Sequence, residues 1–330
     1  MPPLTDLQRY LIHEFVEDYR DGLLSRRGMV RRVLHITGSV GATAALLSAL
    51  GVTPMTRAAA AQEATPAGPN GPQSPLSVAA DDPRVAVEEI AFPAPDGATV
   101  QAYQARPSGE GGTPAAEAAM AASPAAAGAA PVVLVCHENR GLTDHIRDVA
   151  RRWAVEGYVA CAVDLLSRDG GTAAVADPEA IPGLLTDADP TRHVGDFQAA
   201  VEHYRGQAFA DAGRLAMTGF CFGGGITWRA ATAIPELSAA APYYGPPPPL
   251  DQVPNIQAAV LGVYSDDPGD FANEGRDELQ AALEAAGVTF EFKIYPNTQH
   301  AFHNDTGQRY NEEQALAAWN DTVAWFAEHV

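Results

Sequence analysis

A short segment in the second half of the chain constrains the fold most, because it combines a strand, a sharp turn and a helix. The apolar run 214–218 predicts a buried strand, and residues 226–233 predict a helix. The pattern Gly-x-Cys-x-Gly, residues 219–223, joins them and is the cysteine form of a nucleophile elbow. Such a turn strains its central residue, so close neighbours must be glycine. We therefore interpret Cys221 as a nucleophile; the alternative is a buried cysteine in a glycine-rich turn.

Predicted strands and helices alternate through the rest of the chain. Two partly alternating segments, 85–92 and 98–105, flank Pro95-Asp96-Gly97 and predict an antiparallel hairpin. The continuous apolar run 131–136 is typical of a central parallel strand covered on both faces. The sequence therefore predicts an α/β fold with a mostly parallel central sheet and helices on both faces. The further strands expected are 158–166, 237–244, 258–264 and 288–295, and the helices are 144–156, 191–207, 276–286 and 311–330.

Composition excludes some classes of partner. The chain has 330 residues with 46% hydrophobic content, enough for a large core, and its net charge of −20 argues against nucleic acid. Three cysteines do not make a disulfide framework in a chain of this length. Cys136 and Cys161 lie in apolar runs and are expected to be core residues, so Cys221 alone has a reactive setting.

The N-terminal segment, residues 1–61, has the features of an export signal. Arg26 and Arg27 precede an uncharged run, 33–56, and small residues follow at 57–62. This pattern predicts a twin-arginine leader, hence the twin-arginine export machinery as a partner and a periplasmic or extracellular location. Contact with the membrane would then be transient or made through an uncleaved leader. The alternatives are a membrane anchor and an ordinary helix of a cytoplasmic protein.

The remaining chain divides into a linker and one domain. Residues 62–80 are rich in Pro, Ala, Gly and Ser and predict a linker. The α/β domain is expected to cover 81–330, with a flexible low-complexity insertion at 108–130.

A thiol nucleophile needs a base, and His300 is the histidine we expect to fill this role. It follows the last predicted strand, at the carboxyl end of the sheet, where the elbow also lies and where open α/β sheets bind ligands. His303 is the main competitor, whereas His137 and His193 are weaker candidates.

An acidic residue should orient the base, and the loop after strand 258–264 offers three. We expect Asp267 to pair with His300, in preference to Asp266 and Asp270. The order along the chain is then nucleophile, acid, base, which is the order of the α/β hydrolases.

Three motifs together resemble the dienelactone hydrolase family of α/β hydrolases. They are Gly-Phe-Cys-Phe-Gly-Gly at 219–224, His-Glu-Asn-Arg-Gly at 137–141 and Tyr-Pro-Asn-Thr-Gln-His-Ala-Phe at 295–302. The resemblance covers about residues 85–330, and with the leader it is similar to an exported branch of that family. It implies that Glu138 hydrogen-bonds the resting thiol and is released by substrate to help form the thiolate. It also implies an oxyanion hole made by the backbone N–H groups of Phe222 and Asn139.

One position departs from the family pattern. The family holds the substrate carboxylate partly with an arginine four residues after the histidine, and here Asn304 stands there. Arg140, Arg168 and Arg192 are possible substitutes.

These features predict a hydrolase of carboxylic esters or lactones that acts through Cys221, His300 and Asp267. We expect no metal and no cofactor, because the sequence has no evident metal-ligand cluster or phosphate-binding loop. Two other classes are possible. One is a non-catalytic ligand-binding α/β domain, and the other is a thiol redox protein, which would need a second, resolving cysteine.

Overall fold

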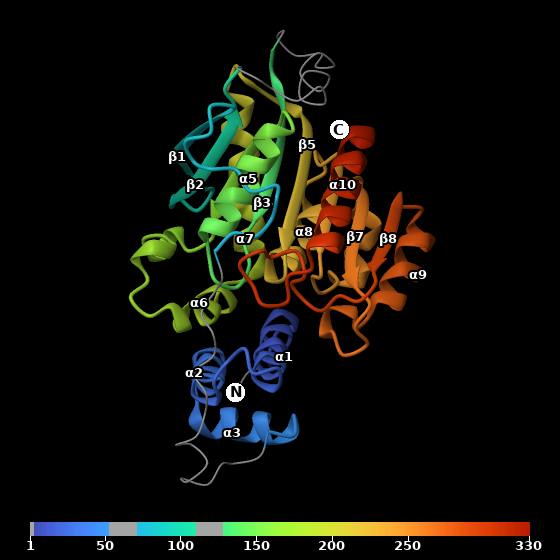
Figure 1. Ribbon diagram of the computed structural model, residues 1–330. Helices are drawn as coiled ribbons and strands as arrows, with labels where there is room; N and C mark the ends of the chain where they lie inside the picture. The colour runs from blue at the N-terminus through green and yellow to red at the C-terminus, as the bar shows by residue number, and fades with distance from the viewer. Residues whose placement is uncertain (1–2, 53–70, 110–127) are drawn as a thin grey trace.

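An eight-stranded sheet forms the centre of the molecule (Figure 1). The computed structural model describes residues 3–52, 71–109 and 128–330. The strand order is β1-β2-β4-β3-β5-β6-β7-β8. The pairs β1–β2 and β2–β4 are antiparallel, and the remaining neighbours are parallel, which confirms the predicted hairpin and the mostly parallel sheet. The strands are β1 Val85–Pro93, β2 Thr99–Pro107, β3 Ala130–Cys136, β4 Val159–Asp164, β5 Ala210–Phe220, β6 Ala239–Tyr243, β7 Ala259–Ser265 and β8 Phe290–Tyr295.

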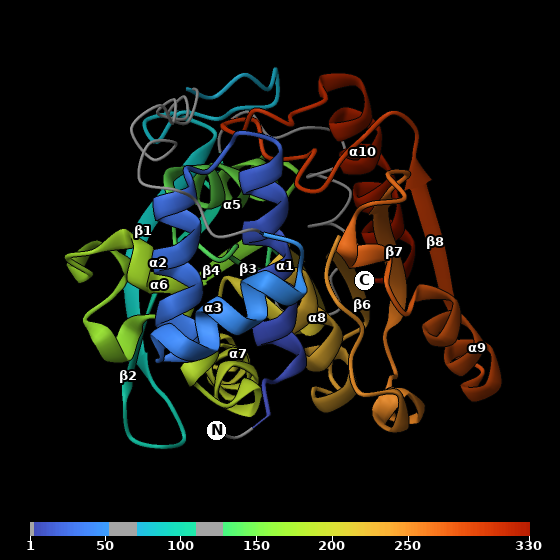
Figure 2. The same ribbon diagram turned by 90° about the horizontal axis from the view of Figure 1, so that it is seen from below.

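Helices cover both faces of this sheet, as predicted. Seen along the sheet, α5 and α10 lie on one face, whereas α7 and α8 lie on the other (Figure 2). The domain helices are α5 Asp144–Val155, α6 Ile181–Asp187, α7 Pro190–Arg205, α8 Phe222–Ala233, α9 Arg276–Ala286 and α10 Glu312–His329.

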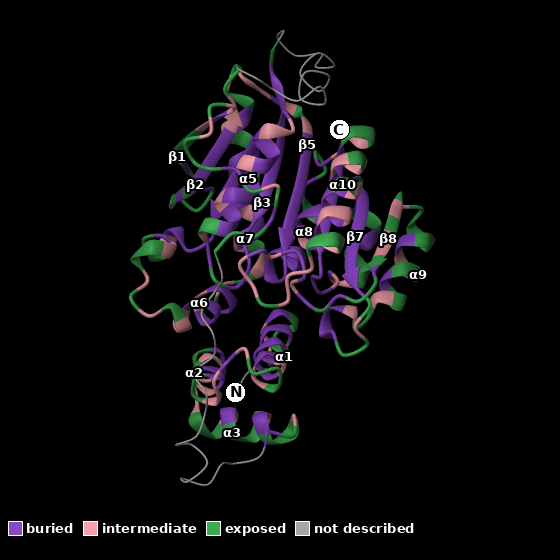
Figure 3. Ribbon diagram, viewed as in Figure 1, coloured by how far each residue is buried: buried purple, intermediate pink, exposed green. Residues whose placement is uncertain are grey.

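The central strands form the core. Every residue of β3, β4, β6 and β7 is buried, and Figure 3 shows this as a continuous purple band between the helices. A strand covered on both faces needs apolar side chains at every position, which explains the continuous apolar runs in the sequence. The parallel strands all end at the same edge, and the elbow therefore lies beside the loops that follow β3, β7 and β8.

Three helices of the N-terminal segment lie beyond this edge of the sheet (Figure 1). They are α1 Asp6–Arg20, α2 Arg26–Thr37 and α3 Val40–Ala49. A capping box starts α1, in which Thr5 and Gln8 each accept the backbone N–H of the other. Leu7, Leu11 and Phe15 of α1 are buried in the same core as the domain. The segment that we expected to precede the folded domain is thus packed against it, although the leader itself stays a prediction.

The uncharged run expected at 33–56 does not form one long helix. Gly38, in the left-handed region, ends α2, and Ser39 caps α3. In the described ranges, no helix combines the length and the apolar composition that crossing a bilayer requires.

Two predicted segments fall largely outside the described ranges. The small residues at 57–62 lie there entirely, as does most of the insertion expected at 108–130. The last part of the expected linker is described, and it lies on the domain. The N–H of Ser74 donates to Asp305, and the N–H of Val78 donates to Asp148.

Candidate active site

The turn between β5 and α8 has the strained geometry that the elbow pattern predicts. Cys221 stands between the two elements with φ 57° and ψ −119°, a backbone conformation that side-chain-bearing residues rarely adopt. A Cβ on Gly219 would come within 2.3 Å of the carbonyl oxygen of Gly223. A Cβ on Gly223 would come within 2.5 Å of the carbonyl oxygen of Cys136. Both glycines are therefore required for the strand, the turn and the helix to approach this closely.

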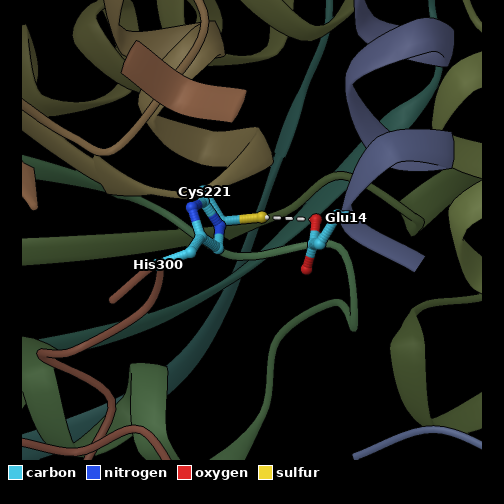
Figure 4. Close-up of side chains that lie close together, drawn as sticks. All are labelled: Glu14, Cys221 and His300. Carbon is cyan, nitrogen blue, oxygen red and sulfur yellow. Dashed lines mark hydrogen bonds between the residues drawn. The ribbon is translucent and has the colours of Figure 1, made fainter. Parts of the chain in front are cut away.

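The Cys221 thiol is buried and donates to a carboxylate of the N-terminal helix. Its Sγ lies 3.1 Å from Oε2 of Glu14 (Figure 4). Burial raises the pKa of the thiol well above its ordinary value, and the charges of Glu14 and Glu138 raise it further. The backbone N–H of Phe222 acts in the opposite direction on this pKa, as a donor to the sulfur would.

Glu14 is a functional candidate that sequence reasoning missed. It is buried within α1, and its second oxygen accepts a hydrogen bond from Nδ2 of Asn139 at 2.7 Å. Burial raises the pKa of this carboxyl, and the charge of His300 opposes the rise. A signal was present in the sequence, because Glu14 shares a helical face with Leu7 and Leu11. A carboxylate on an apolar face needs a buried partner.

His300 lies at the same edge of the sheet and is held by Asp270. The distance from Nδ1 of His300 to Oδ1 of Asp270 is 3.1 Å, and both residues are buried. Burial works against a charged imidazole, but the Asp270 carboxylate outweighs it and raises the pKa of His300. Burial likewise works to raise the pKa of Asp270. Its charged and hydrogen-bonded partners, His300 and Ser265 among them, lower it overall.

The expectation that Asp267 pairs with His300 is wrong. Asp267 is partly exposed, and its carboxylate accepts the N–H of Gly269 at 2.8 Å. That local turn reverses the loop after β7 and brings Asp270, three residues further on, under His300. The exposed Asp266 accepts the backbone N–H groups of Asn297 and Thr298, which fixes the loop that carries the histidine.

The three other candidate histidines make contacts that do not include the Cys221 thiol. His303 is buried and stacks on Phe220 with the ring centroids 5.1 Å apart. Burial lowers its pKa well below the ordinary value. His137 hydrogen-bonds the backbone of Glu138 and Leu165, and His193 bonds the carbonyl of Leu185.

The expected contact between Glu138 and the thiol is not made. Instead, Oε2 of Glu138 accepts Nδ2 of Asn304 at 2.7 Å. Asn304 is the residue where the sequence departs from the pattern implied by the resemblance, and its side chain hydrogen-bonds Glu138. The position beside the thiol that the resemblance gave to Glu138 is filled by Glu14.

A cavity of about 600 Å³ lies over these groups. Glu14, Glu138, Asn139 and Cys221 line it. Among the described residues, the arginines of its wall are Arg140 and Arg309. Arg140 is exposed, whereas Arg309 donates to Asp18 at 2.9 Å and to Asp21 at 2.7 Å.

Arg168, an expected substrate-binding residue, does not line this cavity. It forms ion pairs with Asp96 and Asp196 at 2.8 Å each, so the predicted contact of Arg168 with substrate has no support from this cavity and stays a prediction. Arg192 is also absent from the cavity wall.

The thiol, a carboxylate oxygen of Glu14 and a ring nitrogen of His300 lie within 4.8 Å of one another. These three ligand types could hold a zinc-like ion. They could equally carry out proton transfer around a thiol nucleophile. Tyr10 of α1 closes the cluster; its hydroxyl donates to the carbonyl of Tyr244 at 2.6 Å and lies 3.5 Å from Nε2 of His300.

The two other cysteines are buried in the sheet. Cys136 ends β3 and Cys161 lies in β4, and neither forms a disulfide. Burial raises the pKa of both thiols, that of Cys161 to about 12. The core positions expected for these residues are confirmed, and neither forms a disulfide with Cys221.

Comparisons with known proteins identify the family. The model of the dienelactone hydrolase family matches residues 118–330. A Salmonella typhi protein, provisionally named carboxymethylenebutenolidase, is 36% identical over 246 residues, which are 71% of this chain and 90% of that protein. A Methylorubrum extorquens protein with the same provisional name is 35% identical over 63% of this chain and 75% of its own length.

Solved structures agree. The crystal structure of a provisionally named dienelactone hydrolase from Klebsiella pneumoniae superposes with a TM-score of 0.63 at 32% identity, covering 74% of this chain and 99% of that one. A dienelactone hydrolase-like phosphotriesterase from metagenomic libraries shares the fold, with a TM-score of 0.62 at 22% identity over 74% of this chain and 99% of its own. The sheet, the elbow and these relatives lead to one conclusion: the chain belongs to the dienelactone hydrolase family and has the α/β-hydrolase fold.

Proposed function

We propose that the protein hydrolyses carboxylic esters or lactones through a covalent thioester on Cys221. The observation that carries this proposal is the meeting of the elbow thiol with the His300–Asp270 pair at one edge of the sheet. Thiol, imidazole and carboxylate are the three groups that nucleophilic acyl transfer requires. The names of the relatives, carboxymethylenebutenolidases, support the lactone class.

The first step is attack by the Cys221 thiolate on the ester carbonyl. The backbone N–H groups of Phe222 and Asn139 are proposed to stabilise the oxyanion. Phe222 opens α8, so its N–H is free of intrahelical partners and lies at the positive end of the helix. Loss of one such donor typically costs about 2.7–4 kcal/mol of transition-state stabilisation.

In the second step, the His300 imidazolium protonates the departing alkoxide. Asp270 supports this role because its charge favours the protonated imidazole. The neutral imidazole then takes a proton from water, which hydrolyses the thioester and frees the sulfur. Esters suit this site better than amides, because an alkoxide leaves a thiol tetrahedral intermediate more readily than an amine does.

The side chains of the cavity wall determine where a substrate carboxylate would bind. Asn304 replaces the family arginine and is engaged with Glu138. The exposed Arg140 lines the cavity and supports a role for its guanidinium in holding a substrate carboxylate. Export by the twin-arginine route rests on the Arg26-Arg27 pattern and stays a prediction, as does the periplasmic or extracellular location.

Hydrolysis of an aryl acetate and of a small lactone by Cys221→Ala tests the nucleophile. We expect kcat/KM to fall by at least about 10³-fold, because the thioester can no longer form. Cys161→Ala is the matched control, since it removes a buried cysteine that does not line the cavity, and it should keep most of the activity. Equal rates for Cys221→Ala and the parent would contradict the nucleophile. No turnover of any ester by the folded parent would favour a ligand-binding domain instead.

A further inference from the structure

Helix α1 brings an acidic side chain to the sulfur atom of the elbow. Glu14 is buried, and its two oxygens have separate partners: the Cys221 thiol at 3.1 Å and the Asn139 side chain at 2.7 Å. Figure 4 shows the carboxylate pointing from α1 straight at the sulfur, with His300 on the other side. Both oxygens of this buried carboxylate therefore have hydrogen-bond partners among the residues of the candidate site.

Glu138 is the rival carboxylate, and its contacts differ. Its Oε2 is taken by Asn304 at 2.7 Å. Its charge reaches Cys221 only as a second, weaker influence than that of Glu14. The thiol therefore has one carboxylate as its hydrogen-bond acceptor, and that carboxylate belongs to the N-terminal segment.

The helix that carries Glu14 is fixed in several ways. Leu11 and Phe15, on either side of Glu14, are fully buried. The Tyr10 hydroxyl donates a hydrogen bond to the carbonyl of Tyr244. Arg309 forms an ion pair with Asp18 of the same helix. A side chain held by this much packing loses little entropy when it makes its hydrogen bond, which favours a lasting contact with the thiol.

We propose that Glu14 holds the resting Cys221 thiol and accepts its proton when substrate binds, so that α1 is a working part of the active site. This deepens the hydrolase function proposed above and rests on it. The Sγ–H bond breaks and an Oε2–H bond forms, which leaves a thiolate beside the His300 imidazolium. After water has cleaved the thioester, the proton returns from Glu14 to the sulfur.

The resting state that follows is a guarded thiol. A neutral thiol reacts slowly with electrophiles and oxidants, because the thiolate is the nucleophile. Burial is the main cause that raises the pKa of this thiol and so favours its neutral form, and the hydrogen-bonded carboxylate of Glu14 raises it further. Several other titratable or charged groups act on the sulfur or on its two partners, Glu14 and His300. They are Tyr10, Glu17, Asp18, Arg32, Glu138, Tyr244, Asp270 and Arg309.

The rate of Cys221 alkylation by iodoacetamide, followed by peptide mass spectrometry from pH 5 to 11, tests the proposal in the full-length protein. In Glu14→Gln the amide can still accept from Asn139, but the charge is gone. We expect the alkylation midpoint to move down by about one pH unit or more, which is about tenfold faster alkylation at a fixed pH below the midpoint. The plateau rate at high pH should stay unchanged, because the sulfur is no more exposed.

Two controls separate this effect from other causes. Glu138→Gln should move the midpoint less than Glu14→Gln does. Asp6→Asn, on the exposed first turn of the same helix, should leave it unchanged. A larger shift in Glu138→Gln, or no shift in Glu14→Gln, would overturn the proposal. A raised plateau would also overturn it, since greater exposure of the sulfur would then explain the faster reaction.

Ester turnover tests the proton transfer. Glu14→Gln should have a kcat on an aryl acetate at least about tenfold lower than the parent, despite its faster alkylation. Undiminished kcat would overturn the role of Glu14 as proton acceptor.

Glu14→Asp replaces Glu14→Gln if the latter does not fold. It keeps the negative charge but moves the carboxylate oxygen away from the sulfur, so we expect a smaller shift of the alkylation midpoint in the same direction. An unchanged midpoint would count against the contact between Glu14 and the thiol. The alkylation profile needs no hydrolysis, so it remains readable even if the parent cleaves no ester.

Discussion

At the scale of single residues, the site depends on one strained backbone position. Cys221 has a positive φ, and its neighbours Gly219 and Gly223 let three chain segments meet within van der Waals contact. This turn places the buried Cys221 in the cavity wall at the carboxyl end of β5. This geometry was predictable from the sequence, because a Gly-x-Cys-x-Gly pattern between a strand and a helix has few other solutions.

Replacing Gly219 by alanine should destabilise the protein by about 2–3 kcal/mol, because the new methyl group overlaps the carbonyl of Gly223. The free energy of unfolding from urea titration checks this. Gly195→Ala is the matched control; a Cβ there meets nothing within 4 Å, and the position lies inside α7. We expect it to stabilise by about 0.4–1 kcal/mol. Equal stability of the two variants would show that the elbow is not tightly packed.

At the scale of elements, two loops bring Asp270 to His300. Asp270 follows β7 and His300 follows β8, and parallel strands deliver both to one edge of the sheet. The sequence predicted the two loops but not which aspartate contacts His300. The choice among Asp266, Asp267 and Asp270 depends on how the turn at Pro268-Gly269 folds back, and residue spacing does not reveal that direction.

Asp270→Asn should lower kcat on an aryl ester by about 10²–10⁴-fold, because the imidazole loses its orientation and its charge partner. Asp267→Asn, the matched control, should keep near-parental activity, since its carboxylate bonds only its own loop. Similar losses in the two variants would contradict the pairing of His300 with Asp270.

The same pair predicts how stability changes with pH. The pKa of His300 is raised in the folded protein, so this pair stabilises fully below the unfolded value near 6.5 and less as pH rises through the folded value. The pKa of Asp270 is lowered, so its share is lost only when pH falls below about 4. The stability gap between parent and Asp270→Asn should therefore be larger at pH 5.5 than at pH 9. A gap that widens toward pH 9 would mean that the sign is wrong.

At the scale of the whole molecule, the fold was more predictable than the site. The strands, the hairpin and the helical layers follow from hydrophobic patterns that are local in the sequence, whereas the strand order comes from the structure alone. The contact between Glu14 and Cys221 joins residues 207 positions apart, and Glu14 lies outside the family match at 118–330. Neither the local sequence patterns nor the resemblance to the family could therefore predict the contact between Glu14 and Cys221. The resemblance assigned that contact to Glu138, and Asn304 now holds the Glu138 carboxylate instead.

The N-terminal segment carries two sequence patterns, one typical of an export leader and one typical of a helix packed on a core. Paired arginines and an uncharged run predicted an export leader, yet α1 from the same segment packs into the core and lines the cavity. The amphipathic face of α1, with Leu7, Leu11 and Glu14, gave the physical signal for packing. Export and packing are compatible if the segment stays attached to the domain.

The central claim is that Cys221 forms a thioester with the acyl group of the substrate. Rapid acid quenching of the full-length protein with an aryl acetate, followed by intact-mass and peptide mass spectrometry, tests it most directly. We expect one added acetyl group, located on the peptide that contains Cys221 and removable by hydroxylamine, with Asp270→Asn accumulating less of it per unit time. Steady hydrolysis with no acetyl on Cys221, or with the acetyl group on another residue, would contradict the claim.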